Sequence, residues 1–319
     1  MKNILVVGAG GQIGSELVPF LRNTYGVNNV VAADIDESKC KNLSDGPFEK
    51  LDATDGKTFA EIVKKHKIDA IYNMVALLSA TGEKNPELAW KINMGALENS
   101  LNIAKENKCA VFTPSSIGAF GPTTPMDNTP QDTIMQPNTI YGVCKVSGEL
   151  LSNYYYERFG VDTRSVRFPG IISNVTLPGG GTTDYAVEIY YEAIKQQKYT
   201  SNLDKGTFLD MMYMPDAIKA CADLMEADPA KLKHRNSFNI TAMSFDPEII
   251  GDEIRKHIPE FKLSYDVDPV KQAIANSWPN SMDDSCAREE WGWNPKYNLA
   301  EMTIDMLEKI QEKHDKGLI

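Results

Sequence analysis

The sequence lacks a hydrophobic segment long enough to cross a bilayer, because it contains no run of about 18 apolar residues. The first apolar run, at residues 4–7, is also too short for the hydrophobic core of a secretory signal. Cysteine is scarce: the five cysteines are scattered, their number is odd, and none belongs to a CxxC pair. Such usage is typical of reduced thiols. We therefore expect a cytoplasmic protein that does not bind a membrane.

Basic residues are also outnumbered by acidic ones. Lysine and arginine total 33 against 44 aspartates and glutamates, giving a net charge of -11. Because such a chain repels polyanions, we expect no nucleic-acid partner. The four histidines stand apart from one another and from other potential ligands, and they are His66, His234, His257 and His314. A zinc mechanism needs ligands gathered at metal spacing, so no metal is predicted.

The residues that are present have the composition of a globular protein, with 42% apolar and 24% charged residues in a chain of 319. In the first 170 residues, short β-branched runs alternate with amphipathic stretches. Strands are expected at 3–7, 30–33, 70–75, 110–113 and 162–168, and helices at 13–21, 59–66, 88–104 and 141–155. This alternation predicts an α/β fold with a doubly wound parallel sheet covered by helices.

The alternation breaks after Pro169. A Pro-Gly-Gly-Gly turn at 178–181 precedes an expected helix at 185–195, and the later elements are shorter and interrupted by prolines until a final helix at 299–313. We therefore expect a main domain at 1–170 and a smaller, irregular substrate lobe at 171–319. Strands at 208–214 and 237–240 are expected to return to the main sheet, so that the segment near 206–240 belongs to both parts.

A glycine-rich turn, Gly8-Ala9-Gly10-Gly11-Gln12-Ile13-Gly14, follows the first expected strand and leads directly into a helical pattern. Glycines there allow a tight turn, a close approach of the backbone to a pyrophosphate and close packing of helix on strand. The N-terminus of the helix also attracts phosphate groups. The turn predicts that 1–170 is a dinucleotide-binding Rossmann domain, whose contacts include Gly8, Gly11, Gln12, Ile13 and Gly14.

The residues after the second expected strand indicate which dinucleotide binds. Asp34 ends that strand, where a carboxylate can accept a hydrogen bond from a ribose 2′-hydroxyl. Ile35, Asp36 and Glu37 follow, with no arginine to hold a 2′-phosphate. We therefore predict NAD rather than NADP, with Asp34 and Ile35 at the ribose.

The third expected strand ends at Leu51-Asp52-Ala53, and these residues are candidate neighbours of the adenine ring. For Asp52 two roles are open. Its carboxylate either accepts a hydrogen bond from the adenine amino group or caps the helix that follows.

A tyrosine and a lysine stand four residues apart in Tyr141-Gly142-Val143-Cys144-Lys145, so on a helix they share one face. An ammonium group near a phenol favours the phenolate, which is a suitable base for the proton of an alcohol. Upstream, the strand that ends at Thr113 is followed by Ser115 and Ser116 at the carboxyl edge of the sheet, where ligands bind. We expect one of these serines to act with Tyr141 and Lys145, and the other to cap a turn.

Together these motifs resemble the extended short-chain dehydrogenase/reductases, a family that includes nucleotide-sugar epimerases and dehydratases. The resemblance implies an oxidoreductase with Ser116, Tyr141 and Lys145 as its catalytic residues. Two strings depart from the family pattern: Phe120-Gly121 stands where Tyr-Gly is usual, and the fourth strand runs into Asn73-Met74-Val75-Ala76. Neither departure touches the three catalytic positions.

Longer strings resemble a narrower family, the short-chain type of L-threonine 3-dehydrogenase, over nearly the whole chain. They are residues 75–80, 167–173, 179–186, 277–279 and 291–293. The resemblance implies NAD-dependent oxidation of the 3-hydroxyl of L-threonine to 2-amino-3-oxobutyrate, in threonine catabolism toward glycine or aminoacetone. It also implies further cofactor contacts from Ala76, Leu77, Asn93, Pro114, Phe168 and Ile171, besides Tyr141 and Lys145.

The second lobe offers groups that suit a small polar substrate. Between Phe168 and Ala287 the only arginines are Arg235 and Arg255, whereas a substrate diphosphate usually requires bidentate arginine. The turn at 179–184 supplies backbone amides, hydroxyls and a carboxylate for a zwitterion such as L-threonine, although it could also be a solvated loop. The candidate substrate contacts are Ser79, Ser116, Tyr141, Gly180, Thr182, Asp184 and Trp278. Ser79 could instead cap a turn, and Trp278 could simply belong to the core of the lobe.

Three other interpretations compete with this one. The scarcity of arginine argues against a nucleotide-sugar 4-epimerase or dehydratase. The intact Ser116, Tyr141 and Lys145 argue against a non-catalytic NAD-binding regulator. The glycine turn argues against an assembly protein that binds no ligand. The helices expected at 88–104 and 141–155 carry apolar residues on more than one face. The family resemblance implies that these helices join two chains in a homodimer.

Overall fold

A computed structural model describes residues 1–177 and 179–319. Pro178, which begins the predicted Pro-Gly-Gly-Gly turn, lies outside the described residues. The central element is a six-stranded parallel sheet in the order β3-β2-β1-β4-β5-β7. Its strands are β1 (Ile4–Val7), β2 (Val30–Asp34), β3 (Phe48–Lys50), β4 (Ala70–Asn73), β5 (Ala110–Phe112) and β7 (Thr163–Arg164). The predicted α/β class with a doubly wound parallel sheet is confirmed.

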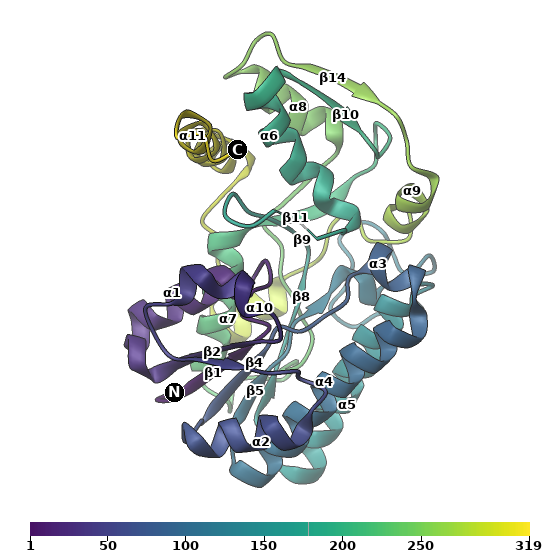
Figure 1. The fold of residues 1–319 in the computed structure, drawn as a ribbon. Coiled ribbons are helices and arrows are strands. Elements are labelled where there is room, and N and C mark those ends of the chain that lie inside the picture. The colour runs from purple at the N-terminus through teal and green to yellow at the C-terminus, as the bar shows by residue number, and fades with distance from the viewer. Residues whose placement is uncertain (178) are drawn as a thin grey trace.

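Helices cover both faces of this sheet (Figure 1). One face carries α2 (Gly56–Lys65), α4 (Pro86–Asn107) and α5 (Ile140–Phe159), and the other carries α1 (Gly14–Tyr25) and α7 (Met214–Glu226). The alternation of side chains along β1 explains the two layers: Leu5 and Val7 join the core under α2 and α4, whereas Ile4 and Val6 join the core under α1 and α7. Both faces are buried, as a parallel sheet requires.

The predicted strand at 162–168 is divided in two. It breaks at Ser165 into β7 and β8 (Val166–Phe168), because the Ser165 N–H donates to Arg235 O at 2.8 Å and its hydroxyl accepts from Ser115 N at 3.1 Å. The second half belongs to another parallel sheet, β12-β8-β6, with β6 (Ser115–Ser116) and β12 (Phe238–Asn239). This division brings Ser115 and Ser116 beside Arg167 and Phe168.

A further sheet, β13-β11-β9, joins the two parts of the chain. β9 (Gly170–Ile172) pairs in parallel with β11 (Leu209–Tyr213), and β13 (Met243–Phe245) pairs antiparallel with β11. The segments predicted to return do form strands, β11 and β12, but they pair with β9 and β8 instead of extending the six-stranded sheet.

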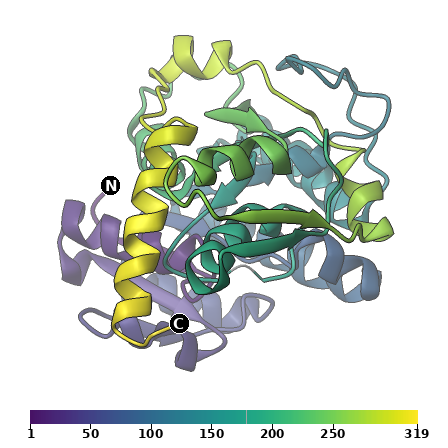
Figure 2. The same cartoon turned by 90° about the horizontal axis from the view of Figure 1, so that it is seen from above.

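The second lobe has its own hydrophobic core, in which Tyr185, Tyr190, Met211, Phe245 and Met306 are buried. Its elements are α6 (Tyr185–Gln196), β10 (Lys198–Ser201), α8 (Pro247–Arg255), β14 (Lys262–Tyr265), α9 (Pro269–Ala275) and α11 (Leu299–Asp315). The helix α10 (Ser285–Trp291) packs instead on the core under α1 and α7. The last helix, α11, packs on α6 and α8 and runs along one side of the molecule (Figure 2). Among the described residues, no helix combines the length and the apolarity needed to cross a membrane.

Candidate active site

The glycine-rich turn leaves β1 and enters α1 with little space around its backbone. Gly8 has a φ of +80°, and a Cβ there would lie 3.1 Å from Met74 C and Val75 N at the end of β4. A Cβ at Gly14 would lie 2.3 Å from Gly8 O. Gly8 therefore permits the turn and Gly14 permits close packing of α1 on it, as a dinucleotide-binding turn requires.

Asp34 is held against this turn. Its Oδ2 accepts a hydrogen bond from Gly10 N at 2.9 Å, and its Oδ1 accepts one from Asp36 N at 2.9 Å. These two bonds fix the plane of the carboxylate, and the remaining lone pairs can accept from ribose hydroxyls. The acidic end of β2 thus lies directly beside the glycine turn.

A cavity of about 340 Å³ opens beside Asp34. Of the predicted cofactor contacts it is lined by Gly8, Gly11, Asp34, Ile35, Leu51, Asp52, Ala53 and Ala76. Sequence reasoning missed the other wall, which includes Thr54 and three residues from the first turns of α4, Leu88, Lys91 and Ile92. The glycine turn and the ends of β2 and β3 make this cavity suitable for the adenosine half of a dinucleotide.

The two roles left open for Asp52 are now distinguished. Its Oδ1 accepts from Thr54 N at 2.9 Å and from Thr54 Oγ1 at 2.7 Å, while the cap of α2 is Asp55, which accepts from Lys57 N and Thr58 N. The capping role for Asp52 is therefore wrong. Asp52 lines the adenosine cavity instead.

Gln12 provides a test of whether a dinucleotide fits. Its Nε2 is buried and has no hydrogen-bond partner within the described chain, although Gln12 and Ile13 line the next cavity along the sheet edge. An unpaired buried donor beside the N-terminus of α1 is suited to an anionic oxygen. The residues present therefore fit the pyrophosphate of a dinucleotide.

Tyr141 lies near the start of α5, with its ring against Gly118. A Cβ at Gly118 would lie 3.0 Å from Cδ1 and Cε1 of Tyr141, so glycine makes this contact possible. The Gly118 N–H also donates to Ser116 Oγ at 3.1 Å. Because Ser116 Oγ accepts this bond, its own proton remains available to an oxygen in the cavity. Gly118 is a supporting residue that sequence reasoning missed.

Lys145 lies one turn further along α5. Its Nζ donates to Pro114 O at 2.6 Å and lies 5.3 Å from the centre of the Tyr141 ring. The carbonyl fixes one of the three ammonium protons, which leaves two for a ribose hydroxyl and the phenolic oxygen. The predicted placement of tyrosine and lysine on one helix face therefore agrees with this geometry.

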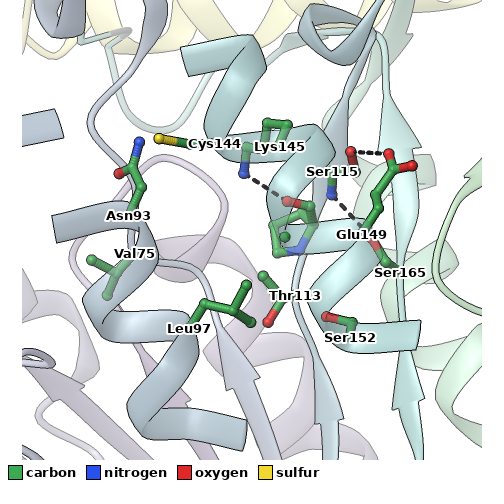
Figure 3. A pocket seen from close by; sticks show the side chains of 12 residues that line it. Val75, Asn93, Leu97, Thr113, Ser115, Cys144, Lys145, Glu149, Ser152 and Ser165 are labelled. Carbon is green, nitrogen blue, oxygen red and sulfur yellow. Dashed lines mark hydrogen bonds between the residues drawn. The ribbon is translucent and has the colours of Figure 1, made fainter. Parts of the chain in front are cut away.

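Ser115 has a different environment from Ser116. Its Oγ donates to Glu149 Oε1 at 2.5 Å, and Glu149 forms a buried ion pair with Arg167, 2.8 Å apart. Figure 3 shows Ser115 and Glu149 among the side chains that line a small cavity of about 30 Å³, which Lys145 lines as well. The hydroxyl of Ser115 is thus engaged, and Ser116 is the better placed of the two serines to meet a substrate.

Asn93 and Leu77, both expected to contact the cofactor, bind each other. Asn93 Oδ1 accepts from Leu77 N at 2.7 Å, and Asn93 Nδ2 donates to Leu77 O at 3.2 Å. In the described residues, Leu77 lines neither the cavity beside Asp34 nor the one at Tyr141, and of these cavities Asn93 lines only the small one at Ser115. Their role here is to hold the loop after β4 to α4.

A second cavity, of about 150 Å³, brings the nicotinamide and substrate candidates together. It is lined by Ser79, Pro114, Ser116, Tyr141, Lys145, Phe168, Ile171, Thr182, Asp184 and Trp278. Gly180 is not part of this wall among the described residues: its φ is +97°, and a Cβ there would lie 2.9 Å from Thr81 Oγ1. The predicted contact of Gly180 is therefore replaced by packing against α3 (Ser79–Lys84).

Two buried hydroxyls line the same cavity as Tyr141. The hydroxyls of Ser79 and Thr182 lie 3.4 Å apart, and Thr182 is only 1% exposed. Ser79 caps no turn, because α3 begins at Ser79 with Leu78 as its cap residue. Trp278 belongs to the core of the lobe and also lines the cavity, and its contact with a substrate stays a prediction.

Asp184 organises the turn at 179–184. Its Oδ2 accepts from Gly180 N at 3.0 Å and Gly181 N at 2.7 Å. Burial, partly offset by these two hydrogen bonds, raises the pKa of Asp184 from 3.8 to about 6. A solvated loop does not describe this turn, since Asp184 is 9% exposed and faces the cavity.

The two arginines between Phe168 and Ala287 are occupied elsewhere. Arg235 Nη1 donates to Asp162 Oδ1 at 2.8 Å, and the Arg235 guanidinium lies 3.8 Å from the centre of the Tyr156 ring. Arg255 Nη1 lies 3.3 Å from Glu248 Oε1. In the cavity at Tyr141, the charged residues among those described are Lys145 and Asp184. Among the described residues, this cavity therefore lacks the bidentate arginine that usually binds a substrate diphosphate.

The glycine turn, the acid after β2 and the Ser-Tyr-Lys set at the sheet edge define a dinucleotide-dependent enzyme. Residues 4–241 match the model of the NAD dependent epimerase/dehydratase family, and the chain belongs to this family. NAD is accordingly its cofactor. The protein is an oxidoreductase of this family and has a Rossmann fold.

Particular relatives are similar over almost the whole chain. An uncharacterized epimerase/dehydratase of Staphylococcus aureus (strain USA300) is 59% identical over 314 residues, with 98% of each chain covered. The solved L-threonine dehydrogenase of Clostridium difficile is 58% identical, with a TM-score of 0.95 and 98% of each chain covered. A monomeric L-threonine 3-dehydrogenase from a metagenome is 42% identical, with a TM-score of 0.93, and the match covers 97% of this chain and 99% of that one.

Proposed function

We propose that this protein oxidises the 3-hydroxyl of L-threonine to a ketone, forming 2-amino-3-oxobutyrate with NAD as the oxidant. The observation that carries the proposal is one cavity that is lined both by Tyr141 and Ser116 and by Ser79, Thr182 and Asp184. The similarity to solved L-threonine dehydrogenases supports the same substrate. The product would then enter threonine catabolism toward glycine or aminoacetone.

In this proposal Tyr141 is the base. Its phenolate takes the proton of the substrate hydroxyl, and the Lys145 ammonium, 5.3 Å from the ring centre, stabilises the phenolate charge. The Ser116 hydroxyl, which already accepts a hydrogen bond from Gly118 N, donates to the substrate oxygen. NAD, held by the glycine turn and Asp34, would supply the acceptor for the hydride that leaves carbon 3.

The two charged ends of L-threonine require different partners. We place its carboxylate at the hydroxyls of Ser79 and Thr182, which lie 3.4 Å apart, and its ammonium at Asp184. An ammonium group beside Asp184 favours the ionised carboxylate and so offsets the effect of burial. The enclosure of this wall also explains why a substrate that lacks either charge would leave buried polar groups unpaired.

Two measurements test this assignment. NADH formation from L-threonine and NAD is expected, and Thr182→Ala should lower kcat/KM for L-threonine while leaving NAD affinity nearly intact, because Thr182 belongs to the second lobe and not to the glycine turn. A nucleotide-sugar substrate is the alternative on this scaffold. Preferential turnover of UDP-glucose or UDP-galactose, measured by product analysis, would replace the present proposal with that one.

We also propose that two chains associate through the outer faces of α4 and α5, in a cytoplasmic homodimer. Trp90 on α4 and Leu150 and Tyr154 on α5 are 45%, 61% and 53% exposed. The five free cysteines are compatible with a reducing compartment. Since one solved relative is monomeric, light scattering at micromolar concentration is the test, and a mass of 35.4 kDa would contradict a dimer.

The domain division remains part of the proposal. Residues 1–170 would bind NAD and 171–319 would bind the substrate, with the segment near 206–240 returning to the first part. The pairing of β12 with β8 and the packing of α7 on the main sheet support a shared segment.

A further inference from the structure

The fold gathers three potential metal ligands that are far apart in the sequence. His234 lies in the turn before β12, while Cys286 and Glu290 stand four residues apart on α10 and therefore share a helix face. A ring nitrogen of His234, the Sγ of Cys286 and a carboxylate oxygen of Glu290 all lie within 4.8 Å of one another. The sequence leaves His234 isolated, because only the fold brings the turn against α10.

The group is held in place by its own hydrogen bonds. Nδ1 of His234 lies 2.5 Å from Glu290 Oε1, and Glu290 Oε2 accepts from Lys233 N at 2.5 Å and from His234 N at 3.2 Å. The Glu290 side chain is only 9% exposed. On the open side, Nε2 of His234 lies 3.4 Å from Asp132 Oδ2, whose side chain is 86% exposed. The open side of the group therefore offers both a path by which an ion can enter and a potential fourth ligand, Asp132.

Imidazole nitrogen, thiolate sulfur and carboxylate oxygen are the ligand atoms that zinc combines most often. With metal–ligand bonds of about 2.0–2.3 Å, a tetrahedral site places its ligand atoms roughly 3.3–3.7 Å apart, so movements of about 1 Å would close this group around an ion. Four carboxylates lie around Cys286, those of Glu290, Asp283, Asp132 and Glu289. The surroundings are therefore negative and attract a cation, which would displace the thiol proton on binding.

We propose that His234, Cys286 and Glu290 bind one zinc ion, with Asp132 or water as the fourth ligand. The ion would fasten α10 to the turn before β12. None of these residues lines the described cavities at Tyr141 and Asp34, so the site is separate from the proposed reaction. This is a structural site, and it departs from the expectation that the chain binds no metal.

The chain contains a matched control. His66 Nε2 lies 2.6 Å from Glu49 Oε1, a histidine–glutamate pair much like that of His234 and Glu290. There the same carboxylate oxygen also accepts from Lys65 Nζ at 2.6 Å, so an ammonium group already occupies the position of a cation. The pair at His66 should not bind zinc, and His66→Asn serves as the reference variant.

The full chain should first be stripped of metal with a strong chelator, which is then removed. Its zinc affinity should then be measured by competition with a chromophoric chelator. We expect one zinc ion per chain, with Cys286→Ser and His234→Asn each weakening the affinity about 10-fold or more and His66→Asn leaving it unchanged. Circular dichroism should confirm that each variant is folded. Equal zinc affinity in wild type and Cys286→Ser, or an equal loss in His66→Asn, would overturn the proposal.

Cobalt provides a readout that needs no variant. Cys286 is the only cysteine of the five that is not buried, so thiolate coordination by added Co²⁺ can be assigned to it. We expect a thiolate-to-cobalt charge-transfer band in the near ultraviolet that zinc removes, and slower reaction of the Cys286 thiol with a disulfide reagent when zinc is bound. The absence of the band at one equivalent of bound cobalt would contradict the site.

Discussion

Tyr141 packs its ring directly on the backbone of Gly118, where a side chain would approach Cδ1 and Cε1 to 3.0 Å. The same glycine donates its N–H to Ser116 Oγ at 3.1 Å. One residue thus positions both the phenol and the hydroxyl that are to meet a substrate oxygen. A methyl group there must displace the ring, because 3.0 Å is below the ordinary contact distance of carbon atoms.

Gly118→Ala should therefore lower kcat by about 10²-fold, since a displacement of reacting groups by about 1 Å can cost that much. NAD affinity should change little. Gly95→Ala is the control, because a Cβ at that position of α4 makes only an ordinary contact, 3.6 Å from Thr54 Cγ2. Steady-state kinetics of both variants would test this, and near-normal turnover in Gly118→Ala would show that the ring position is not critical.

Removal of the phenolic hydroxyl should stop the proton transfer. Tyr141→Phe should reduce kcat about 10²-fold or more, with NAD binding largely preserved. Lys145→Ala should weaken NAD binding and the rate together, because Nζ holds Pro114 O and faces the same cavity as Tyr141. Fluorescence titration with NADH separates the two effects. If Tyr141→Phe keeps normal turnover, another group is the base.

The acid after β2 should determine the choice of cofactor. NAD should be preferred over NADP, because Asp34 can accept from a ribose 2′-hydroxyl and repels a 2′-phosphate. In Asp34→Ala the ratio of the two kcat/KM values should fall about 10-fold or more, equivalent to about 1.4 kcal/mol. Loss of the bond from Gly10 N should also weaken NAD binding somewhat. A higher kcat/KM with NADP in the wild type would contradict this prediction.

Asp184 should give the activity an acidic limit. Its pKa is raised to about 6, so kcat/KM for L-threonine should fall as the pH drops below about 6 and the carboxylate loses its charge. Between 3.8 and about 6 the folded chain binds more protons at this site than the unfolded chain. This group alone therefore makes the free energy of unfolding decrease as pH rises through that interval.

Asp184→Asn separates the charge from the shape of the turn. The amide oxygen can still accept from Gly180 N and Gly181 N, so the turn should persist. At pH 8 the variant should lose about 10–100-fold in kcat/KM for L-threonine, the cost of a hydrogen bond to a charged group. Its pH profile should also lack the limb near 6. An unchanged limb in the variant would assign that titration to another group.

Periodicity predicted the main sheet well but understated the second lobe. Strands β1, β2, β4 and β5 and helices α4 and α5 lie where alternation placed them, because each buries a continuous apolar pattern. The sequence pattern presents the prolines of the second half as interruptions of its elements. Pro215, Pro247 and Pro269 instead stand in the first turns of α7, α8 and α9, where a missing N–H costs nothing.

The site was predictable to the extent that its chemistry is local. The glycine turn and the tyrosine–lysine pair each lie within a single turn or helix, so their spacing is visible in the sequence. Gly118 under Tyr141, Lys91 beside the adenosine cavity and Cys286 beside His234 come from separate elements. Such neighbours depend on packing between elements, which one sequence does not display.

The most direct test is NADH formation from NAD with a panel of alcohols. L-threonine should be the best substrate. D-threonine should be much poorer, 2-butanol and 3-hydroxybutyrate should be poorer by about 10³-fold or more, and L-serine less severely, since it lacks only a methyl group worth about 1–3 kcal/mol. Loss of the reaction in Tyr141→Phe would link it to the described cavity. Equal activity on 2-butanol and L-threonine, or no NADH from L-threonine at all, would contradict the account.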